Sequence, residues 1–226
     1  MTNTLHRFGN AESFHDDYLI IAIPSEGFND EDSMPRLKNF LRVCVKHNPV
    51  NMGNGNCCAL CPETGLNPSA HWKRKVTYDW EGVIEGVNKP GPVYAVFSTK
   101  ENAEACMKEI VKADFGLSVN MSTSIENAKT VATNSAIKRH SVEYALEFND
   151  PHSHLPDSQV LALSTMCGHG MVSSNLAKKM IEMVREGRRT PEEASNTLVR
   201  FCSCGIFNPE RAKRILEETI IKKNKK

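Results

Sequence analysis

Residues 93–121 read VYAVFSTKENAEACMKEIVKADFGLSVNM, and they alternate between two hydrophobic patterns. Val93–Phe97 is a short apolar run typical of a buried strand. Residues 98–113 have helical spacing with a capping-box start, and residues 116–121 form a second strand pattern. This strand–helix–strand alternation predicts an α/β fold, in which helices flank a mixed sheet.

The same alternation continues on both sides of this stretch. Further strands are expected at residues 18–23, 142–148 and 159–164, and further helices at residues 33–46 and 124–136. Beyond residue 164 the pattern is helical, with helices over 174–186, 190–201 and from 209 onwards.

This pattern divides the chain into two parts. We expect an α/β domain over residues 1–156 and a strand plus helical segment over 157–226, packed together as one unit. Residues 47–75 interrupt the first part, and they begin with a run dense in Gly and Asn. We therefore predict a loop insertion at 47–75.

Composition excludes several classes of partner. The chain has 226 residues, with 28 Lys and Arg against 27 Asp and Glu, so its net charge of +1 gives no overall attraction to nucleic acid or to anionic membranes. The longest apolar run, residues 18–24, is too short to span a bilayer. Residues 1–17 lack the pattern of a signal peptide. A cytoplasmic protein with no membrane or nucleic-acid partner is expected.

The eight cysteines are the most informative residues in such a protein. In a reducing compartment disulfides are disfavoured, so clustered cysteines more often bind metal or take part in chemistry. One group contains Cys57, Cys58 and Cys61, a second contains Cys202 and Cys204, and the remaining three (Cys44, Cys106 and Cys167) stand alone.

Three cysteines near the C-terminus share one predicted context. Cys167 follows an expected strand and precedes a helix, whereas Cys202 and Cys204 lie between two helices. Glycines lie beside all three, which lets the backbone wrap closely around a bulky group. Helix N-termini follow both loops and favour thiolates. These features predict a metal centre at Cys167, Cys202 and Cys204.

An iron–sulfur cluster is the first interpretation of this centre. Three thiolates on a [4Fe–4S] cluster leave one iron open, and an open iron can act as a Lewis acid. Zinc is the alternative, with His169 as a fourth ligand, although Cys-x-His and Cys-x-Cys are tighter pairs than the usual zinc knuckle. Buried cysteines without any ligand are the simplest alternative.

Residues near the expected centre are candidates for catalysis. His169 lies two residues after Cys167, and Ser173 and Ser174 lie at a helix start that could bind a carboxylate. Helix capping alone would also explain the serines. His152 and His154 are acid–base candidates in a proline-bounded loop, where a solvated role is the alternative.

The role of the second cysteine group stays open at this stage. Cys58-x-x-Cys61 followed by proline occurs in ferredoxin-type cluster loops. Together with Cys57, the group could bind a second metal, or cover the first site and supply a ligand or thiol to it. It could also be a redox pair or an ordinary loop.

These observations favour an enzyme of lyase, dehydratase or sulfur-transfer type acting on a small molecule. The split into one cysteine plus a close pair is similar in principle to the arrangement in iron–sulfur hydro-lyases. In those enzymes two residues separate the paired cysteines, whereas only one residue separates Cys202 from Cys204. No catalytic residue can therefore be carried over from them. An electron-transfer or redox-sensing protein and a structural zinc module are the alternatives, and a homodimer is left open.

Overall fold

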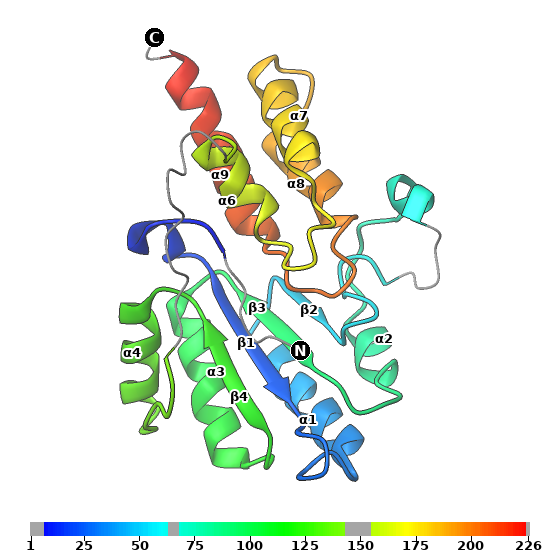
Figure 1. The fold of residues 1–226 in the computed structure, drawn as a ribbon, viewed down its shortest axis with the longest axis vertical. Helices are drawn as coiled ribbons and strands as arrows, with labels where there is room; N and C mark the ends of the chain where they lie inside the picture. The colour runs from blue at the N-terminus through cyan, green and yellow to red at the C-terminus, as the bar shows by residue number, and fades with distance from the viewer. Residues whose placement is uncertain (1–6, 63–67, 143–154, 225–226) are drawn as a thin grey trace.

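The computed structural model describes residues 7–62, 68–142 and 155–224, which form one sheet and eight α-helices (Figure 1). The strands are β1 (Tyr18–Ile23), β2 (Asn51–Gly53), β3 (Val93–Phe97) and β4 (Ser118–Ser122). Their order is β2-β3-β1-β4, and every neighbouring pair is antiparallel. The α/β class with flanking helices is confirmed, but the described strands form an antiparallel sheet instead of the expected mixed one.

The helices divide into two sets along the chain. The first set contains α1 (Ser33–Val45), α2 (Trp80–Glu85), α3 (Lys100–Ala113) and α4 (Ile125–Asn134). The second contains α6 (Ser158–Ser164), α7 (Ser174–Arg185), α8 (Pro191–Val199) and α9 (Pro209–Asn224). Two short 3-10 helices, η1 (Ala11–Phe14) and η2 (Pro68–Lys73), lie in the connections.

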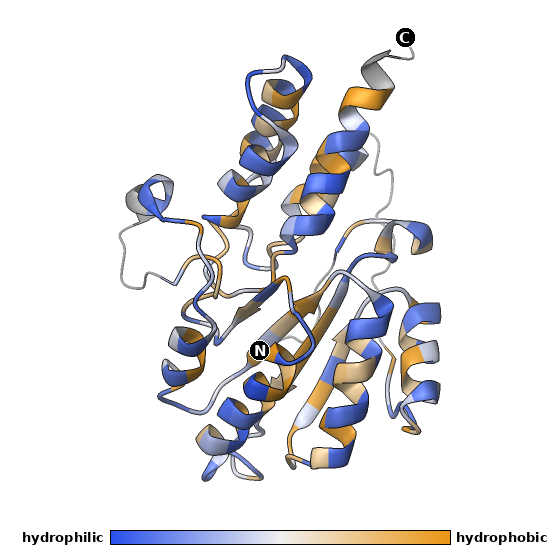
Figure 2. Cartoon of the chain, turned by 180° about the vertical axis from the view of Figure 1, so that it is seen from behind, coloured by the Kyte–Doolittle hydropathy of each residue, from blue (hydrophilic) through white to orange (hydrophobic). Residues whose placement is uncertain are grey.

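Strand β1 is buried on both faces, as its uninterrupted apolar sequence predicts. Side chains alternate along a strand, so Leu19 and Ile21 point to one side while Ile20 and Ala22 point to the other. The two sides belong to two separate apolar clusters. Figure 2 shows the apolar residues concentrated on the central strands, with mixed colouring along the helices. The two sides of β1 therefore contribute to two different parts of the core.

The first face of the sheet is covered by α1 and α3. Leu37, Phe40 and Leu41 of α1 and Ala103 and Ile110 of α3 pack against β1 and β3. The C-terminal helices lie beyond one end of the sheet (Figure 1), and their apolar side chains join Leu19, Ile21 and Val96 of the second face in the other cluster. All the cysteines of the predicted centre lie on this second face.

A buried ionic network attaches the C-terminal helices to the sheet. Asp17, immediately before β1, is fully buried and accepts hydrogen bonds from Arg7 at 2.6 and 2.7 Å and from Arg211 at 2.9 Å. Asn208 donates to the same carboxylate at 2.9 Å, and Arg7 also donates to the backbone oxygen of Ile206. The carboxylate is thus paired on all sides, which offsets its desolvation cost.

Several sequence predictions need correction. Residues 159–164 form helix α6 and not a strand, because Asp157 precedes a run rich in the helix formers Leu and Ala. The loop insertion contains a strand, β2, that is only three residues long. The N-cap of helix α3 is Thr99 and not Ser98, so the helix begins at Lys100, two residues after the start of the expected range 98–113. Residues 143–148 of the expected strand 142–148 lie outside the described residues, as do His152 and His154.

Other predicted elements are confirmed. Strand β1 has the predicted bounds, and Ser124, Ser173 and Thr190 are the N-caps of α4, α7 and α8. Thr190 and Glu193 form a complete capping box, with Pro191 at the first helical position. Within the described part of the chain, no helix combines the length and the apolar character needed to cross a bilayer.

Candidate metal centre

The structure brings the three predicted C-terminal cysteines together. Cys167 lies in the loop after α6, and Cys202 and Cys204 lie in the loop between α8 and α9. Both loops extend toward edge strand β2 (Figure 1). The Sγ atoms of Cys202 and Cys204 are 3.8 Å apart, and the thiol of Cys167 is hydrogen-bonded to that of Cys202. All three side chains are at least 97% buried, with exposures of 3%, 1% and 2%.

Two cysteines of the other group join them. Cys58 and Cys61 are fully buried in the same apolar cluster as the C-terminal three, and the charge of a Cys58 thiolate influences Cys202. Cys57 is turned to the opposite face, where it packs in the cluster with Met52 and Ala59. Cys58 and Cys61 therefore share an apolar cluster with the C-terminal cysteines, while their role as ligands, redox pair or loop residues stays a prediction. We refer to Cys58, Cys61, Cys167, Cys202 and Cys204 as the five-cysteine cluster.

A tight hairpin presents Cys58 and Cys61 to this face. Ala59 donates its backbone N–H to Met52 at 2.7 Å, and isolated bridges join Gly53 to Cys58 and Cys58 to Cys61. The segment after the hairpin returns along it, since Thr77 donates to Leu60 at 2.9 Å. Backbone pairing onto β2, and not apolar packing alone, therefore organises this part of the insertion.

Two glycines allow the two cysteine loops to cross. A Cβ atom on Gly53 would lie 1.8 Å from the backbone oxygen of Cys204, and one on Gly205 would lie 2.5 Å from the nitrogen of Gly53. Gly205 also has a φ of +91°, which L side chains rarely adopt. No other residue type fits at this contact, so the glycines set how closely the loops approach.

The 3-10 helix η2 supports the loop on the other side. His71 stacks on Phe201 with ring centroids 5.3 Å apart, and Trp72 meets the same ring edge-on at 5.0 Å. Arg74 donates to the backbone oxygen of Arg200 at 3.2 Å. The insertion therefore holds the end of α8, directly before Cys202.

Crowding makes the buried thiols resist ionisation. Hydrogen bonding to Cys202, followed by burial, raises the pKa of Cys167 well above its usual value. Hydrogen bonding to Cys61, followed by burial, raises the pKa of Cys58 in the same way. For Cys202 the hydrogen bond from Cys167 favours the thiolate, but the bond to Cys204 and burial outweigh it and raise the pKa. A bound cation would reverse this preference by stabilising the thiolates.

Backbone N–H groups act in the opposite direction on two of the sulfurs. Those of Met171 and Val172 lower the pKa of Cys167, and those of Leu60 and Cys61 lower the pKa of Cys58. Hydrogen bonds to sulfur are one of the means by which proteins tune iron–sulfur clusters. The loops are thus shaped to stabilise negative charge on sulfur, although the neutral thiol is favoured overall.

The fit to a metal is one of donor chemistry. Within residues 7–62, 68–142 and 155–224, no three His, Cys, Asp or Glu side chains converge in the arrangement of a bound metal ion. The donors themselves are soft, buried thiols, which suit zinc, copper(I) or iron–sulfur clusters. Five of them belong to one buried apolar cluster.

The catalytic candidates lie at different places around the cluster. His169 is exposed and lines a cavity of about 320 Å³ together with Tyr94 and the loops at 54–56 and 86–93. Ser173 is exposed and accepts the capping hydrogen bond from Leu176 at 3.2 Å, and Ser174 begins α7. Neither serine is among the described residues that line this cavity. Their predicted catalytic role stays a prediction.

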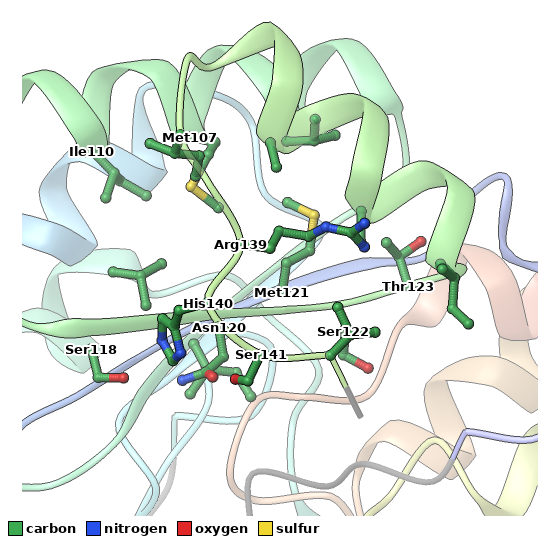
Figure 3. Close-up of a pocket in the computed structure, with 18 of the residues that line it drawn as sticks. Met107, Ile110, Ser118, Asn120, Met121, Ser122, Thr123, Arg139, His140 and Ser141 are labelled. Atoms are coloured by element: carbon green, nitrogen blue, oxygen red, sulfur yellow. The ribbon is translucent and has the colours of Figure 1, made fainter. Parts of the chain in front are cut away.

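A larger cavity, of about 880 Å³, lies over β4 on the side of α3 and α4 (Figure 3). Met107, Ile110 and Met121 give it apolar walls. Three of its polar atoms, Asn120 Nδ2, Thr123 Oγ1 and Arg139 Nη1, are buried without a hydrogen-bond partner. Among the described residues no cysteine lines this cavity, so it is separate from the candidate metal centre.

Sequence reasoning missed Tyr94 and Asn54 as site residues. Tyr94 alternates with core residues in a predicted strand, so nothing local distinguishes it from a packing residue. Its pKa is raised to about 12 by burial and by the neighbouring Cys204 and Cys202, which places it beside the thiols. Asn54 belongs to the Gly- and Asn-rich run before Cys57. The composition of that run is the feature of the sequence that could have pointed to Asn54.

Comparison with family models, with curated proteins and with solved structures found no match to the chain. The candidate centre therefore rests on its own residues and their geometry.

Proposed function

We propose that this chain is an iron–sulfur enzyme in which Cys167, Cys202 and Cys204 bind a [4Fe–4S] cluster. Such a cluster would supply one open iron as a Lewis acid. The reaction class that fits is a lyase or dehydratase reaction, or the removal or transfer of sulfur, on a small molecule. The observation that carries the proposal is that buried thiols from separate loops lie in one apolar cluster, with the sulfurs of Cys202 and Cys204 3.8 Å apart.

The surroundings of the cysteines are apolar and include backbone N–H groups that would stabilise a negatively charged iron–sulfur cluster. The thiols lie among apolar side chains, and backbone N–H groups of the Cys167 loop point at the sulfur of that residue. Helix α7 begins shortly after that loop, and its N-terminal dipole favours nearby thiolates. His169, which lines the adjacent cavity, would be a side chain able to move a proton.

A second candidate function, electron transfer or redox sensing, is favoured by the position of Cys58. This thiol is close enough to Cys202 for their charges to interact. If Cys58 completed the ligand set, no iron would be open for a substrate.

A structural zinc site is favoured by one distance. Thiolates bound tetrahedrally to zinc at about 2.3 Å have sulfurs roughly 3.8 Å apart. The Cys202 and Cys204 sulfurs are separated by 3.8 Å. The three proposals therefore differ in metal and in the role of Cys58.

Anaerobic purification followed by iron, sulfide and zinc analysis tests them together. We expect a brown protein with about four iron and four sulfide per chain, as for one four-iron cluster. Colourless protein with one zinc per chain would overturn the cluster proposal. Retention of the cluster in a Cys58→Ala variant would support the open iron, whereas its loss would favour full ligation and electron transfer.

A further inference from the structure

The cavity beside His169 lies against the five-cysteine cluster. Its walls are the loop at 54–56, the loop at 86–93, Tyr94 and His169. We infer that this cavity binds a small carboxylate through Lys89 and His169. Binding of the acid does not require a metal. A reaction of the bound acid does rest on the proposed function, because that reaction would need a cluster at the cysteines.

The walls of the cavity are held in place by hydrogen bonds within the described loops. Asn54 Oδ1 accepts from the backbone of Asn56 at 3.0 Å and of Cys57 at 3.1 Å, while its Nδ2 donates to Val83 at 3.0 Å. A Cβ atom on Gly86 would lie 2.9 Å from Asn54 Nδ2, so the two loops meet closely. The cavity is therefore largely preformed, as ligand sites usually are.

Tyr94 connects the cavity to the cysteines. Its side chain lines the cavity, and it also packs in the apolar cluster that contains the five cysteines. Electrostatic influence from Cys204 and Cys202 reaches its hydroxyl. A molecule in the cavity would thus be separated from the sulfur atoms by one aromatic side chain.

The polar groups of the cavity select an anion. Lys89 carries a positive charge, His169 offers a ring nitrogen for a hydrogen bond, and the described lining contains no Asp or Glu. The other polar side chains that line it are amides and the Tyr94 hydroxyl, which suit hydroxyl or amino substituents. A volume of about 320 Å³ fits a small metabolite. A short hydroxy or amino acid matches this combination of charge and size.

Calorimetric titration tests the inference on the full chain, both metal-free and as purified anaerobically. The probes are lactate, malate and citrate, with malamide as the neutral analogue of malate. At least one acid should bind both forms of the protein, and malamide should not. Lys89→Gln should weaken that binding at least ~10-fold, because a charge-assisted hydrogen bond is lost.

Two further variants keep the test specific. Lys112→Gln, on the exposed surface of α3, should bind as the unmodified chain does. Gly91→Leu should weaken binding, since Gly91 lines the cavity and a Cβ there meets no atom within 4 Å, so a leucine adds bulk to the wall without a clash. Lys89→Gln and Gly91→Leu should retain the metal content of the unmodified chain.

The outcomes separate this inference from the proposed function. If the protein contains no iron as purified anaerobically but binds an acid in a way that depends on Lys89, the carboxylate site is supported and the cluster proposal is overturned. A protein with its cluster that binds none of the three acids, or binds them equally well after Lys89→Gln, would overturn the carboxylate site and leave the cluster proposal standing.

Discussion

Two sets of buried cysteines lie on opposite faces of the same sheet. Cys44 of α1 and Cys106 of α3 have sulfurs 3.7 Å apart, almost the same separation as the 3.8 Å between Cys202 and Cys204. Burial, and then hydrogen bonding to Cys106, raises the pKa of Cys44 well above its usual value. By sulfur distance and burial alone the two sets are nearly indistinguishable.

Their surroundings separate them. Cys44 and Cys106 point from regular helices into a packed apolar layer, where one backbone N–H, that of Cys44 itself, acts to lower the pKa of Cys44. The five-cysteine cluster is built from loops with glycine crossings, and backbone N–H groups lower the pKa of Cys167 and Cys58. The comparison teaches that the backbone around a thiol, more than its distance to another thiol, distinguishes a candidate ligand from a packing residue.

The largest expected difference between the two sets is in metal content. Cys202→Ala should lose nearly all bound metal, because Cys202 contacts both Cys167 and Cys204. Cys106→Ala should keep it, and metal analysis of both variants after anaerobic purification measures the contrast. Equal metal content in the two variants would remove the distinction between the two sets.

The next largest effect concerns the ionic network that attaches the C-terminal helices to the sheet. These helices flank the loops of Cys167, Cys202 and Cys204, whereas Cys44 and Cys106 lie in α1 and α3. Asp17→Asn should lower the free energy of unfolding by about 3–5 kcal/mol, because it leaves buried Arg7 and Arg211 without their counter-charge. Urea denaturation measures it. Glu182→Gln, which removes an exposed partner of Lys179, is the control and should leave the midpoint unchanged. A similarly small shift of the urea midpoint in both variants would show that the ionic network around Asp17 does not stabilise the fold.

A smaller effect is expected where the two cysteine loops cross. Gly205→Ala should cost about 2–4 kcal/mol, since the new Cβ meets the Gly53 backbone and the φ of +91° disfavours alanine. It should also reduce metal content. Gly91→Ala, whose Cβ meets no atom within 4 Å, should change stability by less than ~0.5 kcal/mol in the same urea experiment. Full metal content in Gly205→Ala would argue that the crossing does not position the ligands.

The smallest effect is expected for the packing pair. Cys106→Ala should cost about 1 kcal/mol of unfolding free energy, because cysteine behaves there as a small apolar side chain that fills space next to Cys44. The urea midpoint checks this. A cost as large as that of Asp17→Asn, or a loss of bound metal, would give this pair a role beyond packing.

Local periodicity was sufficient for most of the fold. The apolar run at β1 and the helical spacing of α1 and α3 predicted those elements, because a strand and an amphipathic helix leave different spacings in the sequence. The run at residues 159–164 failed, since six largely apolar residues are compatible with either a buried strand or a buried helix. Strand β2 was missed because three residues carry no measurable period.

The candidate site was predictable only in part. The glycine-flanked loops singled out Cys167, Cys202 and Cys204, and the structure brings these together. The arrival of Cys58 and Cys61 could not be predicted, since it depends on contacts between segments far apart in the chain. A glycine needed at such a contact, like Gly53, resembles in sequence any glycine needed for a turn.

The two-sided packing of β1 has a consequence during synthesis. Its Ile20 side faces α1 and α3, which follow within the first half of the chain, whereas its Leu19 side waits for the C-terminal helices. At about 5–20 residues per second, the ribosome needs roughly 10–40 s to make the ~200 residues from β1 to the end of α9. During that interval the Leu19 side of β1 lacks the apolar side chains of the C-terminal helices that it packs with in the folded chain.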